Sequence, residues 1–270
     1  MGVRKELEKT PGYKAANHRI DSWWWLVALV IGIVVLLATL QPDPYWRVIR
    51  FVSDGLLVTI GVTVTAFILT LVFGLVIALG RLAKHGFVRW FTTIYVEIAR
   101  GVPLLVQLLF WYFAFPSLIQ ALGRLFRIDA MAHYLANPFL MAILGLTVCY
   151  SAYMSEIYRA GIQSIPKGQN EAARSLGMTQ NQAMRHIILP QAFRVVLPPV
   201  GNEFISLLKD SSLVSTVAVA DLTRRGREFM ASTFLPVETW IMVALIYLIM
   251  TLISARIVAW IERKTQTEEH

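Results

Sequence analysis

The sequence predicts an all-α polytopic membrane protein with about six transmembrane helices and both termini in the cytoplasm. Of its 270 residues, 56% are hydrophobic and only 16% are charged, whereas soluble domains carry about 25% charged residues. Long uncharged runs alternate with basic segments, as expected for spanning helices joined by cytoplasmic loops. The net charge of +8 fits loops that face anionic lipid, and no basic cluster with interleaved aromatics indicates nucleic-acid binding.

The first predicted span is Trp23–Leu40, which follows a basic cytoplasmic tail. Three tryptophans begin this run, and Tyr45 and Trp46 follow it, as in the aromatic belts at membrane interfaces. The run is longer than the apolar core of a signal peptide, and residues 38–42 contain no small-x-small cleavage site. We therefore expect an uncleaved helix, followed by a short outer loop at residues 41–54.

Three further spans are predicted at residues 55–80, 102–119 and 138–155. The first of them exceeds the roughly 20 residues that a membrane helix needs, so we expect it to tilt. Basic residues at 81–89 indicate a cytoplasmic turn, and residues 120–137 an outer loop. Small and hydroxylated residues in the first of these spans predict close helix contact, with a polar path as the alternative. They are Thr59, Gly61, Thr63, Thr70 and Gly74.

The next two apolar runs, residues 191–208 and 213–220, are short and interrupted by Pro, Gly and charged residues. They predict a broken helix, which a membrane tolerates only where protein or water satisfies the backbone. An outer loop at residues 221–236 and a last span at residues 239–255 complete the topology. That outer loop is basic and so departs from the positive-inside rule. Either the loop binds an acidic partner, or it is an exception to a rule that is only a statistical bias. The residues concerned are Arg224, Arg225 and Arg227.

Residues 164–190 form a polar island on the predicted cytoplasmic side. Gly177 suits a left-handed helix stop. Thr179 followed by Gln182 predicts a capping box at the start of a second helix, and Pro190 forbids its simple continuation. The stretch is expected to be a stiff helix-turn-helix, with an amphipathic loop lying on the bilayer as the alternative.

The island also carries a spaced pattern: Glu171-Ala172-Ala173, three residues, Gly177, nine residues, Ile187, one residue, Leu189-Pro190. This pattern resembles the EAA motif in the membrane subunits of ABC importers. The resemblance implies a coupling helix that docks on a cytoplasmic ATPase. It also implies that ATP and Mg bind the ATPase and that this chain holds no cofactor; the chain contains no phosphate-loop motif, so we expect it not to be an enzyme. The implied coupling residues are Glu171, Ala172, Ala173, Gly177, Leu189 and Pro190.

A narrower resemblance covers residues 55–262, through segments 55–60, 97–107 and 208–213. These segments are similar to the polar amino acid (His/Glu/Gln/Arg-type) branch of the importer permeases. The resemblance implies a five-helix permease domain that contains the coupling loop. Residues 1–54 would add a tail, an extra helix and a loop before that domain, and residues 263–270 a cytoplasmic tail after it.

The implied complex lies in the bacterial inner membrane. Its other parts would be two cytoplasmic ABC ATPase subunits, a second permease copy or a sister permease, and an extracytoplasmic solute-binding protein. The substrate would be a polar amino acid, with another small polar solute as the alternative, and no nucleic acid is involved.

Substrate contacts are expected near Lys209 and Asp210, because the two offer both charge signs to an amino acid zwitterion. Charged groups within a membrane are costly and are therefore candidates for function; the alternative is that they pair with each other or with neighbouring spans. Residues that would add hydrogen bonds are Asn202, Glu203, Ser211, Ser212 and Gln107. Candidates for a structural or gating role are Arg100, Gly101, Pro103, Glu156 and Arg159, the last two as an ion pair or a functional pair.

Two other function classes fit less well. A self-contained secondary carrier would need coupling carboxylates deep in its spans, usually with internal repeats, and residues 55–80 and 102–119 contain no acidic residue. A membrane enzyme would need a nucleophile or metal constellation. The histidines are scattered and Cys149 is the only cysteine, so neither a metal site nor an intrachain disulfide is expected.

Overall fold

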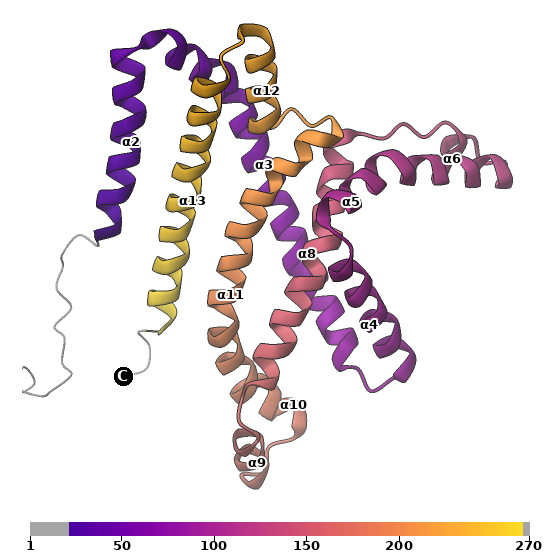
Figure 1. Ribbon diagram of the computed structural model, residues 1–270. Helices are drawn as coiled ribbons and strands as arrows, with labels where there is room; N and C mark the ends of the chain where they lie inside the picture. Colours follow the sequence, from indigo (N-terminus) through magenta and orange to yellow (C-terminus); the bar gives the residue numbers. More distant parts are fainter. Residues whose placement is uncertain (1–21, 267–270) are drawn as a thin grey trace, which may run out of the picture.

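The computed structural model describes residues 22–266, and this part of the chain is helical with no strand, which confirms the all-α prediction (Figure 1). The tail predicted at the N-terminus and the last residues of the C-terminal tail lie outside the described range. The helices are α2 (Ser22–Leu40), α3 (Pro42–Leu82), α4 (Gly86–Gly101), α5 (Leu104–Leu109), the π-helix η1 (Phe110–Ala114), α6 (Phe115–Phe126), α7 (Asp129–Ala132), α8 (Pro138–Gln163), α9 (Lys167–Ser175), α10 (Gln180–Ala183), the π-helix η2 (Met184–Ile188), α11 (Leu189–Asp210), the 3-10 helix η3 (Ser211–Val217), α12 (Leu222–Thr233) and α13 (Pro236–Gln266).

In Figure 1, α2, α3, α8, α11 and α13, and α4 together with α5, run between the end that carries α9 and α10 and the opposite end, with α3 and α4 oblique. Within the described residues, five segments are long and apolar enough to cross a membrane. The third of these segments is Leu104–Phe126, which runs from α5 through α6, so neither α4 nor α11 is among the five. Helix α11 nevertheless packs along both α8 and α13. The beginning of α2 and the end of α13 point to the side that carries α9 and α10 (Figure 1), in agreement with the predicted N-in, C-in topology.

The predicted outer loops are wrong in detail, because each contains helix. Helix α3 begins at Pro42 and has a kink at Asp43, whose φ of −103° and ψ of 111° are not helical, so most of residues 41–54 is helix rather than loop. Pro42 and Pro44 lie in the first turn, where a missing N–H costs little. Helices α6 and α7 occupy residues 120–137 in part, and α12 occupies most of residues 221–236. Apolar runs identify only the part of a helix that lies in the membrane, so the polar ends of these helices resemble loops in the sequence.

The predicted span at residues 102–119 overlaps the apolar segment Leu104–Phe126, but helix α4 comes before it in the third crossing. Helix α4 rises obliquely from the cytoplasmic turn, the chain breaks at Val102–Pro103, and α5 continues the crossing (Figure 1). After η1, helix α6 turns aside from the bundle (Figure 1). The crossing therefore begins at Gly86. The apolar run starts later in the sequence because α4 carries charged residues.

Helix α11 changes where the sequence indicated a break. The α-helix gives way to the 3-10 helix η3 after Asp210. It passes through Pro198, Pro199 and Gly201 without interruption. Two adjacent prolines remove two backbone donors, and packing against α8 and α13 keeps the segment helical in spite of that loss.

The most extensive contact in the bundle joins α3 to α8. A Cβ added at Gly74 would come within 2.7 Å of Met154 Cβ, so the two helices approach along their backbones. Thr59, Thr63 and Thr70 are fully buried. This arrangement supports the predicted role of these residues in helix contact.

One ion pair joins α12 to α3 at the outer end of the bundle, and two more lie within α12. Arg225 pairs with Asp54 of α3 and with Glu228, and Arg224 also pairs with Glu228. Hydrogen bonds from Arg224 and Arg225 lower the pKa of Glu228. Arg227 donates to Ser215 Oγ at 2.8 Å. Two of the three arginines that depart from the charge rule are thus neutralised within the chain.

The contact at Gly74 predicts a selective loss of stability. Replacing Gly74 by valine should lower the free energy of unfolding by about 1–3 kcal/mol, because overpacking forces neighbouring groups apart. Gly61→Val on the same helix is the control, since a Cβ there meets nothing within 4 Å. Thermal unfolding of the purified protein in detergent measures both; an equal loss in the two variants would contradict the assignment.

Candidate functional site

The helix-turn-helix at residues 164–190, here called the knob, projects beyond the ends of α8 and α11 (Figure 1). Gly177 ends its first helix with a φ of 83°. The N–H of Gly177 donates to Arg174 O at 2.9 Å, and the N–H of Met178 donates to Ala173 O at 3.1 Å. This pair of hydrogen bonds is a Schellman motif, so the predicted stop is confirmed.

The second helix of the knob begins with the predicted capping box at Thr179. Thr179 Oγ1 accepts from the N–H of Gln182 at 3.3 Å, and Gln182 Oε1 accepts from the N–H of Thr179 at 2.8 Å. Pro190, however, does not end this helix. The chain continues through the π-helix η2 into α11, because a π-helical turn shifts the hydrogen-bond register ahead of the proline. The knob is therefore joined to α11 without a loop.

The residues of the EAA pattern are divided between the surface and the interior of the knob. Glu171 and Ala172 are exposed, whereas Ala173 is buried. Leu189 and Pro190 are exposed at the base. Sequence reasoning overlooked Leu176, which ends the first helix of the knob with 83% of its surface exposed. Its signal was available: it is the only large apolar side chain between residues 167 and 177.

A polar cavity of about 370 Å³ lies where the α4–α5 turn meets α8 and α11. Asp210 and Glu203 come from α11, Arg100 from the end of α4, and Tyr150 and Tyr153 from α8. Asp210 Oδ2 accepts a hydrogen bond of 2.7 Å from the Tyr150 hydroxyl. The Arg100 guanidinium carbon lies 5.3 Å from the centre of the Tyr153 ring. The rest of the lining is Gly101, Val102, Pro103, Leu104 and Cys149.

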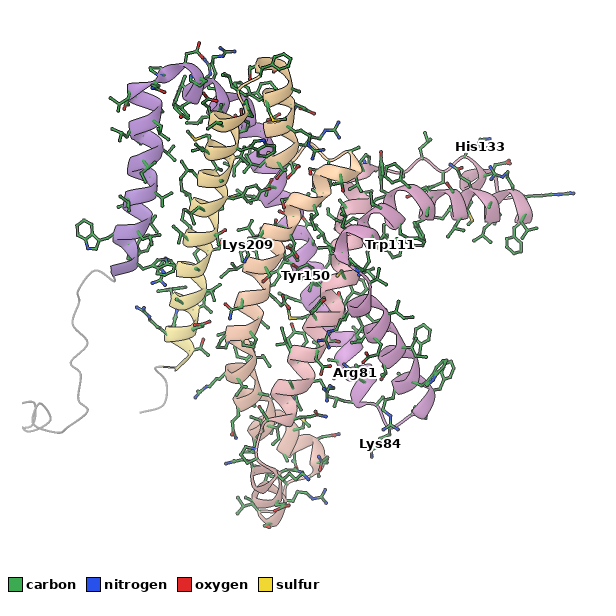
Figure 2. The ribbon with its side chains drawn as sticks, in the orientation of Figure 1. Arg81, Lys84, Trp111, His133, Tyr150 and Lys209 are labelled. Carbon is green, nitrogen blue, oxygen red and sulfur yellow. The ribbon has the colours of Figure 1, made fainter. Side chains whose placement is uncertain are left out.

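This cavity presents one guanidinium and two carboxylates to a single space. Tyr150 lies about midway along α8, between α8 and α11 in Figure 2. Charged side chains within membrane-spanning segments are energetically costly, and they are therefore candidates for a functional role. The arrangement suits a small solute that carries both a carboxylate and an ammonium group.

The predicted substrate residues fall into two groups. Asp210 and Glu203 line the cavity, but Lys209 is exposed and does not. Lys209 forms no ion pair with Asp210 in the described part of the chain. Asn202 is exposed, Ser212 is partly buried, and neither lines the cavity. Ser211 is buried and donates to Leu208 O at 2.7 Å.

Gln107 lies behind the cavity wall and stabilises the turn between α4 and α5. Its Nε2 donates to Ala99 O at 2.8 Å and to Val102 O at 2.9 Å. The break at Val102–Pro103 leaves backbone carbonyls without helical partners, and the amide of Gln107 satisfies them. The position of Arg100, Gly101 and Pro103 in the cavity lining depends on this turn.

Glu156 and Arg159 lie near the cytoplasmic end, away from the cavity. Glu156 pairs with both Arg159 and Arg81, and the Arg159 Nε to Glu156 Oε2 distance is 3.2 Å. Figure 2 shows Arg81 nearer than Tyr150 to the knob end of the bundle. This cluster joins α3 to α8, as expected for an ion pair that positions two helices.

Residues 70–267 match the family of binding-protein-dependent transport system inner membrane components. The chain belongs to this family. It is a multi-pass inner-membrane component of a transport system, and the family description states that such transport depends on a binding protein.

Its relatives share most of their length with it. The L-cystine transport system permease protein TcyB of Bacillus subtilis (strain 168) is 37% identical, over 88% of this chain and 95% of the relative. The glutamine transport system permease protein GlnP of Escherichia coli (strain K12) is 36% identical, over 81% and 94%. A crystal structure of an amino acid ABC transporter with histidines is similar with a TM-score of 0.71 and 37% identity, over 84% of this chain and 97% of that chain.

The left-handed turn at Gly177 predicts a backbone effect that is free of crowding. A Cβ at this position meets nothing within 4 Å, so only the positive φ opposes substitution. Gly177→Val should cost about 1–2 kcal/mol locally and speed amide hydrogen exchange across residues 172–183. Gly177→Asn should retain protection because Asn tolerates this conformation. Equal exchange in the two variants would contradict the assignment.

Proposed function

We propose that this chain is the permease subunit of an ATP-driven importer of amino acids and that the polar cavity lies on the substrate path. The cavity carries the proposal, because it offers a cation and two carboxylates at mid-membrane depth. Relatives of this chain are named as permeases for L-cystine, arginine and glutamine. This chain would form the translocation path, and its partner subunits would supply the energy for transport.

Within this cavity each charged group has a role. Arg100 would bind the carboxylate of the amino acid, and Asp210 and Glu203 would bind its ammonium group. The Tyr150 hydroxyl holds the Asp210 carboxylate at 2.7 Å, so this carboxylate is oriented before a substrate arrives. Preorganisation of this kind reduces the cost of ordering on binding.

The partners follow from the same proposal. Two cytoplasmic ATPase subunits would bind ATP and Mg, a second permease copy or a sister permease would complete the membrane part, and a solute-binding protein would deliver the amino acid from outside. Hydrolysis would take place in the ATPase subunits alone.

The knob would be the contact with the ATPase. Its first helix carries the exposed Glu171 and ends at the exposed Leu176, and apolar anchors surrounded by polar residues are typical of protein interfaces. An uninterrupted helical path leads from the knob through η2 and α11 to Asp210. A displacement of the knob by the ATPase would therefore move the cavity wall that carries Glu203 and Asp210.

The coupling proposal predicts the effect of a charge at position 176. Leu176→Glu should reduce ATP-driven uptake at least about tenfold and weaken co-purification of the ATPase, because it places a carboxylate in an apolar contact. Leu135→Glu is the matched control, since Leu135 is 88% exposed and lies on the outer side. Normal uptake and normal ATPase retention in Leu176→Glu would overturn the proposal.

The cavity proposal predicts which charges matter for uptake. Asp210→Asn and Glu203→Gln should each lower uptake about tenfold to a hundredfold, because hydrogen bonds between charged groups contribute about 1.5–3 kcal/mol. Lys209→Gln removes a charge next to the cavity but outside it, and uptake should stay near normal. Uptake assays in vesicles that contain the assembled complex measure all three. Undiminished uptake in both carboxylate variants would contradict the assignment.

A further inference from the structure

The helical hairpin of α6 and α7, here called the outer arm, extends sideways from the bundle (Figure 1). Helix α6 packs mainly against α7 and η1. The arm begins where the α4–α5 crossing ends, on the side opposite the knob (Figure 1). Nothing in the proposed transport path uses it, so its role needs an explanation of its own.

The arm is a preformed unit rather than a loose loop. A Cβ at Gly123 would lie 2.2 Å from Ala132 N, so α7 rests directly on the backbone of α6. Gln120 Nε2 donates to Tyr134 O at 2.8 Å, and the N–H of Ile128 donates to Gly123 O at 2.8 Å. These contacts cover the face of α6 that carries Gln120 and Gly123.

The opposite face of α6 is apolar and uncovered. Leu118, Leu122 and Leu125 follow one another at intervals of four and three residues, which places them on one stripe of the helix. Their exposed fractions are 52%, 45% and 72%, and that of the adjacent Phe126 is 66%. An apolar stripe of this kind must be covered by another apolar phase.

The orientation of the arm identifies that phase. The spanning helices define the direction across the membrane, and α6 runs across them at the level of the outer end of α8 (Figure 1). His133, which follows α7, lies on the outer side of α6 in Figure 2. Because α7 covers the outer side, the apolar stripe points toward the membrane interior, as in amphipathic helices that lie in the interface.

The charges of the arm favour lipid over a second copy of the chain. Arg124 and Arg127 are exposed, and neither forms an ion pair within the part of the chain that the structure describes. Cations beside an apolar stripe suit phosphate headgroups at the bilayer surface. A twofold contact through the same face of another copy would instead bring like charges together.

We propose that the outer arm lies on the outer leaflet of the bilayer as an interfacial anchor. Leu118, Leu122 and Leu125 enter the boundary between headgroups and acyl chains, and Arg124 and Arg127 contact the headgroup phosphates. The arm then holds the outer end of the α4–α5 crossing, which carries the turn at the polar cavity. This inference goes beyond the transport function and does not depend on it.

Site-directed spin labelling tests the proposal in the complete transporter. Leu122→Cys places a nitroxide on the apolar stripe, and His133→Cys places one on the outer side of the same arm. Both side chains are exposed, so folding is not at risk. The complex is reconstituted in nanodiscs of phosphatidylcholine and phosphatidylglycerol, and the unsubstituted chain, whose Cys149 is buried, gives the labelling blank.

Collisions with oxygen, which concentrates in lipid, are compared with collisions with a water-soluble nickel chelate. The label at position 122 should collide several-fold more with oxygen than with the chelate, and the label at position 133 should show the reverse. Chelate collisions at position 122 equal to those at position 133 would overturn the proposal, since the stripe would then face water. Protection of position 122 from both reagents would overturn it in favour of a protein cover, such as a second copy.

Discussion

The uninterrupted helical path from the knob to Asp210 is the constraint on which the rest of this structure depends. It begins at the capping box of Thr179 and passes through the π-helix η2 and the proline pair of α11. Each of these features is a place where an isolated helix would bend or end. Packing of α11 between α8 and α13 keeps the path helical. A rigid connection of this kind is the simplest way to join a cytoplasmic contact to a cavity at mid-membrane depth.

The need to give buried polar groups hydrogen-bond or ion-pair partners explains how several helices are joined. Hydrogen-bonding groups in a membrane must find partners inside the protein. Gln107 satisfies the carbonyls at the α4–α5 break, and Glu156 joins Arg81 to Arg159. The polar cavity is the place where charged groups gather around an open space. Charged groups that pair with other protein groups fix the positions of helices. Charged groups that line the cavity are available to bind a solute.

Local features of this chain are predictable from its sequence, whereas several helix boundaries are not. The capping box, the glycine stop and the change of helix after Asp210 were predictable, because each depends on a few neighbouring residues. The outer loops were predicted wrongly, since helices α6 and α12 and the start of α3 are polar or amphipathic and lack a long apolar run. The continuation through Pro190 was also missed, because a π-helical turn leaves no clear signal in composition.

The sequence by itself determined the membrane class, the topology and the knob, because these follow from hydropathy, charge and local backbone preference. Only the tertiary structure decided which charges share a cavity. Lys209 and Asp210 are adjacent in sequence, but successive helical residues point about 100° apart, so Asp210 meets Tyr150 while Lys209 stays outside. Arg100 reaches the same space from another helix. Contacts between helices that are far apart in the sequence depend on tertiary packing, which cannot be predicted from local sequence patterns.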